Sequence, residues 1–148
     1  MNQISVLLFV LFFSYNFYGQ TNYNSGDKEL DTELAEINSA AKLDLAKFKG
    51  ELLTAYKIPA VKVDELLKEK MEPAEILLAA KISSIAKKPL ELVVTSYKTN
   101  KSKGWGYIAK EMGIKPGSPE FHSLKNQSKG NGKDKSNKGK GNSKGKNK

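Results

Sequence analysis

Few side chains of this sequence have the types and spacing that catalytic chemistry needs. The chain has no Cys and one His, His122, so it offers neither a thiolate nucleophile nor a His-based metal site. Four carboxylates follow one another at helical spacing: Glu29, Asp31, Glu33 and Glu36. They lack the spacing and the glycine of a calcium loop, which indicates a solvated helix face. We therefore expect no catalytic residue, no metal, no cofactor and no enzymatic activity.

The clearest chemistry belongs to lysines near the C-terminus. All 25 basic residues of the chain are Lys, and nine of them stand against one Asp between residues 125 and 148. These nine are Lys125, Lys129, Lys133, Lys135, Lys138, Lys140, Lys144, Lys146 and Lys148. A flexible polycation binds nucleic acid, lipid headgroups or acidic glycans by releasing their counterions. We predict that the nine lysines bind polyanions, and the alternative is that they only keep the chain soluble.

The formal net charge of +9 is unevenly distributed along the chain. Residues 27–80 carry a net charge of −4, residues 81–115 carry +6, and residues 125–148 carry +8. Arg supplies the forked donor that recognises guanine edges and phosphates, and this chain has none. We therefore expect any nucleic-acid binding to be weak and indifferent to sequence.

The stretch WGYIAKEMGIKPGSPEFHSLK, residues 105–125, has the outline of a helix-turn-helix. The supporting helix would be 105–112, the turn 113–117 and the recognition helix 118–125. That second helix is short and offers no Arg, Asn or Gln before Asn126. Gly104-Trp105-Gly106 also lacks the third glycine and the preceding strand of a phosphate-binding loop. Nucleic-acid reading through residues 104–125 is therefore the alternative hypothesis.

Hydrophobic periodicity predicts an all-α fold. Apolar residues recur every three or four positions along one stripe: Leu30, Leu34, Ile37, Ala41, Leu45, Phe48, Leu52 and Ala55. This stripe predicts one long helix that ends at Pro59. Shorter helical segments follow at 61–70, 73–87, 89–100 and 104–112. We expect residues 73–87 to form the most buried of these helices. No segment alternates with a period of two for long enough to predict a sheet.

The last helices carry clear start and stop signals. Gly113 fits the left-handed position after a helix, and Ile114 supplies the apolar contact of a Schellman stop. Ser118 is an expected N-cap, and Pro119 fits the first helical position after it. We predict a structural motif of buried and turn residues in this region: Trp105, Ile108, Ala109, Met112, Gly113, Ile114, Pro116 and Phe121.

Residues 1–19 are expected to be a secretory signal peptide. The apolar run Ile4–Phe13 has the length of a signal-peptide core and is short of the ~20 residues that span a bilayer. We expect cleavage between Gly19 and Gln20, and the alternative is a retained membrane anchor. Such a signal predicts an exported protein, periplasmic or extracellular, that meets the membrane only before cleavage.

The remainder divides by composition into three parts. Residues 20–26 are polar and are expected to form a flexible leading segment. Residues 27–125 are expected to form a small helical domain of one long and several short helices. Residues 126–148 are rich in Lys and Gly and hold no apolar residue apart from Gly, which predicts a disordered tail.

Residues 72–125 resemble the C-terminal part of a family of exported bacterial helical proteins with no assigned activity. The matching residues are Pro89, Val93, Val94, Tyr97, Lys98, Gly104, Trp105, Gly106, Ile108, Ala109, Lys110, Glu111, Gly113, Ile114, Lys115, Pro116, Gly117, Ser118, Pro119, Glu120, Phe121, His122, Leu124 and Lys125. The resemblance covers about a third of the chain. It implies an exported location and a helical architecture, and it implies that the motif is a structural signature rather than a DNA reader.

The expected function is that of a non-enzymatic envelope protein with a structural or interaction role. A helical body would bind a partner protein or an envelope polyanion, and the cationic tail would add non-specific attraction, including weak attraction to nucleic acid. No small-molecule substrate is evident from the residues. The alternative is a nucleic-acid or polyanion binder that uses residues 104–125.

Overall fold

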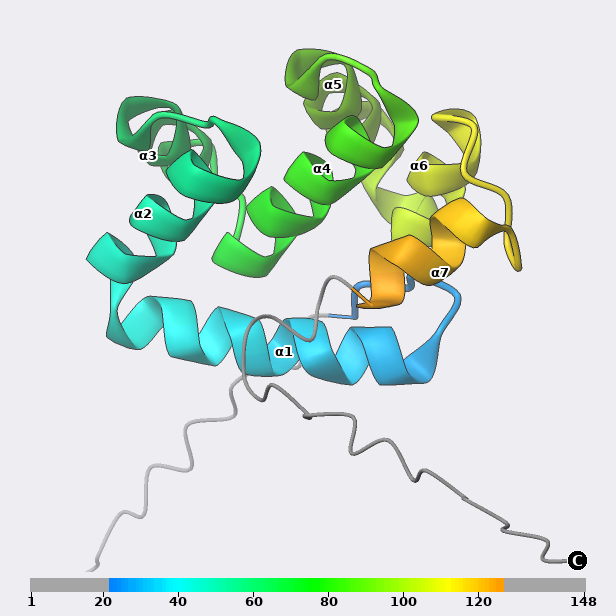
Figure 1. Ribbon diagram of the computed structural model, residues 1–148, viewed down its shortest axis with the longest axis horizontal. Coiled ribbons are helices and arrows are strands. Elements are labelled where there is room, and N and C mark those ends of the chain that lie inside the picture. The colour runs from blue at the N-terminus through cyan, green and yellow to red at the C-terminus, as the bar shows by residue number, and fades with distance from the viewer. Residues whose placement is uncertain (1–21, 127–148) are drawn as a thin grey trace, which may run out of the picture.

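The computed structural model describes residues 22–126, which form helices joined by short connections and contain no strand (Figure 1). The expected signal peptide and residues 127–148 of the expected tail lie outside the described residues. The helices are α1 Lys28–Leu43, α2 Leu45–Tyr56, α3 Ala60–Lys68, α4 Pro73–Ala86, α5 Leu90–Asn100, the 3-10 turn η1 Lys101–Lys103, α6 Trp105–Glu111 and α7 Pro119–Asn126. The all-α class is therefore confirmed for the described part of the chain.

The prediction of one long first helix from the apolar stripe is wrong, because the structure has two helices in its place. α1 ends at Leu43, and α2 begins at Leu45 and turns away from the axis of α1 (Figure 1). Asp44 lies between them in a non-helical conformation, and its side chain accepts the Lys47 N–H at 3.0 Å. Asp is a preferred N-cap, so this residue ends one helix and begins the next. The apolar spacing runs through the break, which is why the periodicity does not reveal it.

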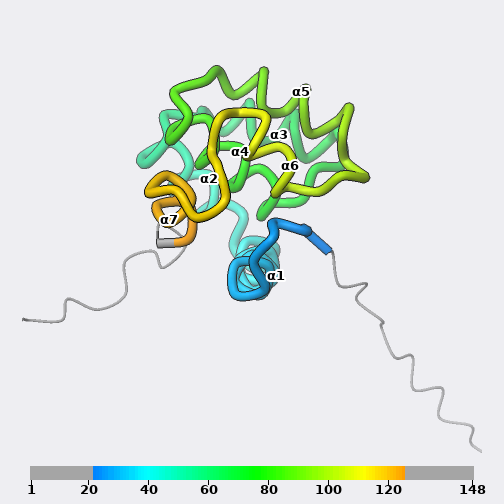
Figure 2. Tube along the Cα trace, turned by 90° about the vertical axis from the view of Figure 1, so that its right-hand side faces the viewer, coloured from blue at the N-terminus to red at the C-terminus, as the bar shows by residue number. Residues whose placement is uncertain are grey.

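α4 is the central helix, as the sequence of residues 73–87 predicts. It begins with Pro73 in its first turn, and Glu72 and Glu75 form a capping box. α4 contacts α1, α2, α3, α5 and α7, and most of its residues are buried. The other helices of the body lie on one side of α1, which crosses beneath them (Figures 1 and 2). The core therefore sits around α4, between α1 and the shorter helices.

α6 ends in the predicted Schellman stop. The Ile114 N–H donates to the Ala109 carbonyl at 2.8 Å, and the Gly113 N–H donates to the Lys110 carbonyl at 3.0 Å. Gly113 has a φ of +98°, a conformation in which a side chain is strained. Ile114 is buried directly after the stop. The stop therefore turns the chain sharply toward α7.

The expected flexible leading segment is instead docked where it is described. Residues 22–26, here called the N-terminal strap, lie between α1 and α6 (Figure 2). The Tyr23 carbonyl accepts the Trp105 N–H at 3.0 Å, and the Asn24 carbonyl accepts the Gly106 N–H at 3.0 Å. The first N–H groups of a helix have no partner inside that helix. The strap supplies those partners, so it forms part of the folded body.

Candidate functional site

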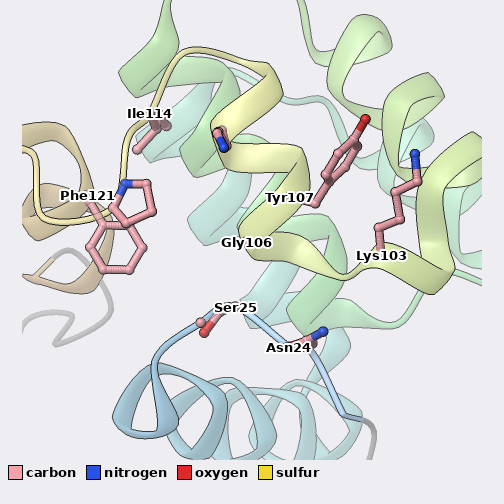
Figure 3. A pocket seen from close by; sticks show the side chains of 10 residues that line it. Asn24, Ser25, Lys103, Gly106, Tyr107, Ile114 and Phe121 are labelled. Carbon is pink, nitrogen blue, oxygen red and sulfur yellow. The ribbon is translucent and has the colours of Figure 1, made fainter.

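The strap, α6 and the chain leading into α7 surround a pocket of about 360 Å³ (Figure 3). We call it the α6 pocket. Its lining residues are Asn24, Ser25, Gly26, Lys103, Gly106, Tyr107, Lys110, Ile114, Pro116 and Phe121. The volume lies at the lower end of the range for small-ligand sites. The pocket thus brings together segments that are about 80 residues apart in the sequence.

Two glycines let the strap approach α6 closely enough to form the pocket. Gly104 has a φ of +77°, and a Cβ built there would lie 2.6 Å from the Asn24 Cβ. A Cβ at Gly106 would lie 2.8 Å from the Ser25 carbonyl oxygen. Real side chains essentially never approach that closely, so the strap could not keep its position against Ala. The Gly104-Trp105-Gly106 segment therefore forms the surface against which the strap packs.

The α6 pocket has an apolar end and a cationic end. Ile114 and Phe121 lie on one side of Gly106, and Lys103 and Tyr107 extend together on the other side (Figure 3). The Lys103 Nζ lies 4.3 Å from the centroid of the Tyr107 ring, which is a cation–π distance. The lining contains no carboxylate. The pocket is therefore a positively charged recess with one apolar wall.

The lysine charges at this pocket are not neutralised by neighbouring acids. Lys103 and Lys110 are exposed, and neither has an ion pair with a carboxylate of residues 22–126. Elsewhere lysines do pair, as Lys98 does with Glu69 at 2.7 Å. Unpaired lysines keep an attractive potential for anions near the surface.

A second titratable cluster is buried between the strap, α4 and α5. Glu75 is 3% exposed, and it accepts hydrogen bonds from the Tyr97 hydroxyl and, at 2.8 Å, from the Glu72 N–H. Burial and the Glu75 hydrogen bond raise the pKa of Tyr97, and burial and the charge of Glu72 raise the pKa of Tyr23. Both phenols thus remain donors at neutral pH. This cluster does not line the α6 pocket, so we interpret it as a network that joins the helices.

Lys81 is a buried charge that the sequence interpretation missed. It lies in α4, is 1% exposed and faces the charge of Glu33 on α1. Burial lowers its pKa to about 8, and the Glu33 charge opposes that shift. A lysine with a lowered pKa can act as a nucleophile where substrate reaches it, but this one lies in the core. The signal available in the sequence was one Lys inside the apolar run 76–82.

Three of the four carboxylates expected to form a solvated face have specific contacts instead. Asp31 accepts the Ser25 N–H at 3.0 Å and so holds the strap. Glu33 faces Lys81, and Glu29 lies 3.5 Å from the Lys125 Nζ. Their interpretation as a merely solvated face is therefore wrong for these three residues.

The predicted structural motif divides between core and turn. Trp105, Ile108, Ala109, Met112 and Ile114 are buried together, whereas Gly113 and Pro116 are exposed and Phe121 is half-buried. The Trp105 ring stacks on the Tyr97 ring, with centroids 4.4 Å apart and an interplanar angle of 13°. The structure therefore places most of this motif in the interior, and its residues Ile114, Pro116 and Phe121 line the α6 pocket.

Lys125 is the one member of the predicted polyanion-binding set that is described, and it is engaged within the fold. Its Nζ lies 2.7 Å from an Asp27 oxygen, and the hydrogen bond lowers the pKa of Asp27 and raises that of Lys125. Asp27 also caps α1 by accepting the Leu30 N–H. We therefore remove Lys125 from the set, whose other eight lysines lie outside the described residues.

No protein-family model, no curated protein and no solved structure matches this chain. Among residues 22–126, no helix is long and apolar enough to cross a membrane. In the same part of the chain, no three His, Asp or Glu side chains gather as a metal site would need. The expectations of no metal, no cofactor and no catalysis remain predictions.

Proposed function

We propose that this protein is an exported, non-enzymatic envelope protein that binds anionic partners through lysine charge. The observation that supports the proposal is a group of exposed lysines in residues 81–115 with no ion pair to the described residues: Lys87, Lys88, Lys103, Lys110 and Lys115. The eight tail lysines, Lys129 to Lys148, continue the same charge along the sequence. Along the sequence, these lysines follow the net acidic residues 27–80.

Nucleic-acid reading through residues 104–125 is the weaker candidate. α7 would be the recognition helix, but Leu124 is buried and Lys125 pairs with Asp27 and Glu29. A recognition helix needs side chains that are free to reach base edges in the major groove. The remaining exposed face of α7 offers Glu120 and His122, which are poor matches for a polyanion.

Binding of heparin, an acidic glycan, tests the proposal with three forms of the chain. The first is the full chain, the second lacks residues 126–148, and the third carries Lys→Gln at Lys87, Lys88, Lys103, Lys110 and Lys115. We expect the deletion to remove most of the affinity and the substitutions to remove a smaller part, because each lysine that contacts a polyanion releases counterions. Circular dichroism should show the same helix content in all three forms.

A matched control carries Lys→Gln at three exposed lysines of the net acidic residues 27–80, Lys28, Lys68 and Lys70. This control removes three charges and should leave heparin affinity nearly unchanged. Heparin binding that is unaffected by both the deletion and the five substitutions would contradict the proposal, because lysine charge would then not carry the interaction.

A further inference from the structure

We propose that the α6 pocket binds a ligand that carries a carboxylate at one end and an apolar or aromatic group at the other. The inference goes beyond polyanion binding, because it needs the pocket and not the cationic tail. Three features of the described residues support it: the position of the lysines, the apolar wall and the hydrogen bonds that fix the strap.

The lysines mark the place of the carboxylate. Lys103 lies just before α6, and Lys110 lies one turn after Gly106 on the same helix. Residues three and four positions apart share a helix face, so Lys110 stands on the pocket side with Gly106 and Tyr107. Lys is a compact point charge without the fork of Arg, so these lysines attract the carboxylate by charge rather than by paired hydrogen bonds.

The apolar wall marks the place of the second group. Ile114 and Phe121 face the pocket from the chain that follows α6 (Figure 3). Phe121 is only half-buried, so part of its ring remains available to a ligand. Burial of an apolar group here would add a favourable contribution in proportion to the area removed from water. The two ends of the pocket therefore select a ligand with two different ends.

The strap makes the pocket a preformed recess. Its carbonyls are bonded to the N–H groups of Trp105 and Gly106, and its Ser25 N–H is bonded to Asp31. Because Gly106 has no side chain, the backbone of Ser25 packs directly against α6 between the cationic and apolar ends. A preformed site loses less conformational entropy on binding than a mobile one.

The test is a titration of the isotope-labelled full chain with 3-phenylpropionate, followed by two-dimensional NMR at about 150 mM salt. We expect resonances of Gly106, Tyr107, Ile114 and Phe121 to shift together. Propionate, which lacks the ring, and 3-phenylpropionamide, which lacks the charge, should each bind at least about tenfold more weakly. Equal binding of the amide, or shifts centred away from these residues, would overturn the proposal.

Variants assign the two ends of the site. Lys103→Gln with Lys110→Gln should weaken binding of 3-phenylpropionate about tenfold, and Phe121→Ala should do the same. The matched control, Lys87→Gln with Lys88→Gln, removes two exposed lysines that do not line the pocket and should leave binding unchanged. An unchanged affinity in the Lys103 and Lys110 double variant would refute the cationic end.

Peptides distinguish a free acid from a polypeptide terminus as the source of the carboxylate. A tripeptide that ends in Phe with a free carboxylate should bind, and its amidated form should not. A peptide affinity above that of 3-phenylpropionate assigns the site to a protein C-terminus, and a lower one assigns it to a small acid. Heparin titration of the Lys103 and Lys110 double variant separates the two proposals, because the tail should preserve most polyanion binding there.

Discussion

Trp105 is held at the junction of the strap, α5 and α6. It is 2% exposed, its backbone N–H donates to the Tyr23 carbonyl of the strap, and its ring stacks on Tyr97. Its Nε1 has no hydrogen-bond partner among the described residues. The ring, rather than its polar atom, therefore carries the contribution of this side chain to stability.

Trp105→Ala should lower the free energy of unfolding by ~3–5 kcal/mol, the usual cost of a large cavity in a core. Trp105→Phe is the control, because it keeps an aromatic face against Tyr97 while it removes the unpartnered indole N–H and part of the ring volume. It should cost clearly less than the Ala variant. Urea denaturation followed by circular dichroism measures both. A Trp105→Ala variant as stable as the parent would show that the indole is not part of the core.

Lys81 gives the protein a measurable pH dependence. Its pKa falls from 10.5 to about 8 on folding, so the unfolded chain binds more protons than the folded one between these values. The free energy of unfolding must therefore rise as pH increases above 8. Above pH 10.0 the buried Tyr23 and Tyr97 keep protons that the unfolded chain loses, which reverses the slope.

Denaturation at pH values from 7 to 11 should thus show maximal stability near pH 10. Lys81→Met should flatten the rise above pH 8 and keep the decline at higher pH. The variant Lys88→Met removes an exposed lysine and should leave the profile unchanged. A rise that persists in Lys81→Met would mean that another group titrates in this range.

At the scale of elements, the strap and α6 depend on each other through two glycines and two backbone hydrogen bonds. The first turn of α6 needs acceptors, and the strap needs a surface without a Cβ. This mutual requirement explains why a polar segment is ordered beside a short helix.

Gly106→Ala should destabilise the protein by ~1–3 kcal/mol, as overpacking usually does, because its Cβ would strike the Ser25 carbonyl. Gly50→Ala is a matched control within α2, where a Cβ meets nothing within 4 Å. It should stabilise the protein by ~0.5–1 kcal/mol, since Ala has a higher helix propensity than Gly. Thermal melts should move in opposite directions. Shifts of the same sign would show that the strap does not press on Gly106.

The sequence predicts the later helices well because their boundaries are local signals. Pro73, Gly113 and Ser118 act through their own backbone or that of close neighbours, and the structure confirms each. Asp44 was missed because the apolar spacing is continuous across it. The α6 pocket could not be predicted, because its walls meet through backbone hydrogen bonds and close backbone packing between residues 22–26 and α6, and no pattern in the sequence reports such contacts.

At the scale of the whole molecule, export is the expectation on which the proposed location rests. The apolar run Ile4–Phe13 motivates it. Intact-mass measurement of the protein from its native host should find a chain that begins near Gln20. A cytoplasmic protein that still carries Met1 would contradict export and would favour nucleic-acid binding instead.

The central claim is that lysine charge, without sequence recognition, carries the interaction of this protein. Its most direct test is the affinity of the full chain for two single-stranded DNA oligonucleotides of equal length and different sequence, measured between about 50 and 200 mM salt. We predict equal affinities and a linear fall of log K with log salt, with a slope no steeper than about −9 for the eight tail lysines and the five exposed lysines of the body. Affinities that are independent of salt, or that rank one sequence clearly above the other, would contradict the claim and assign recognition to residues 104–125.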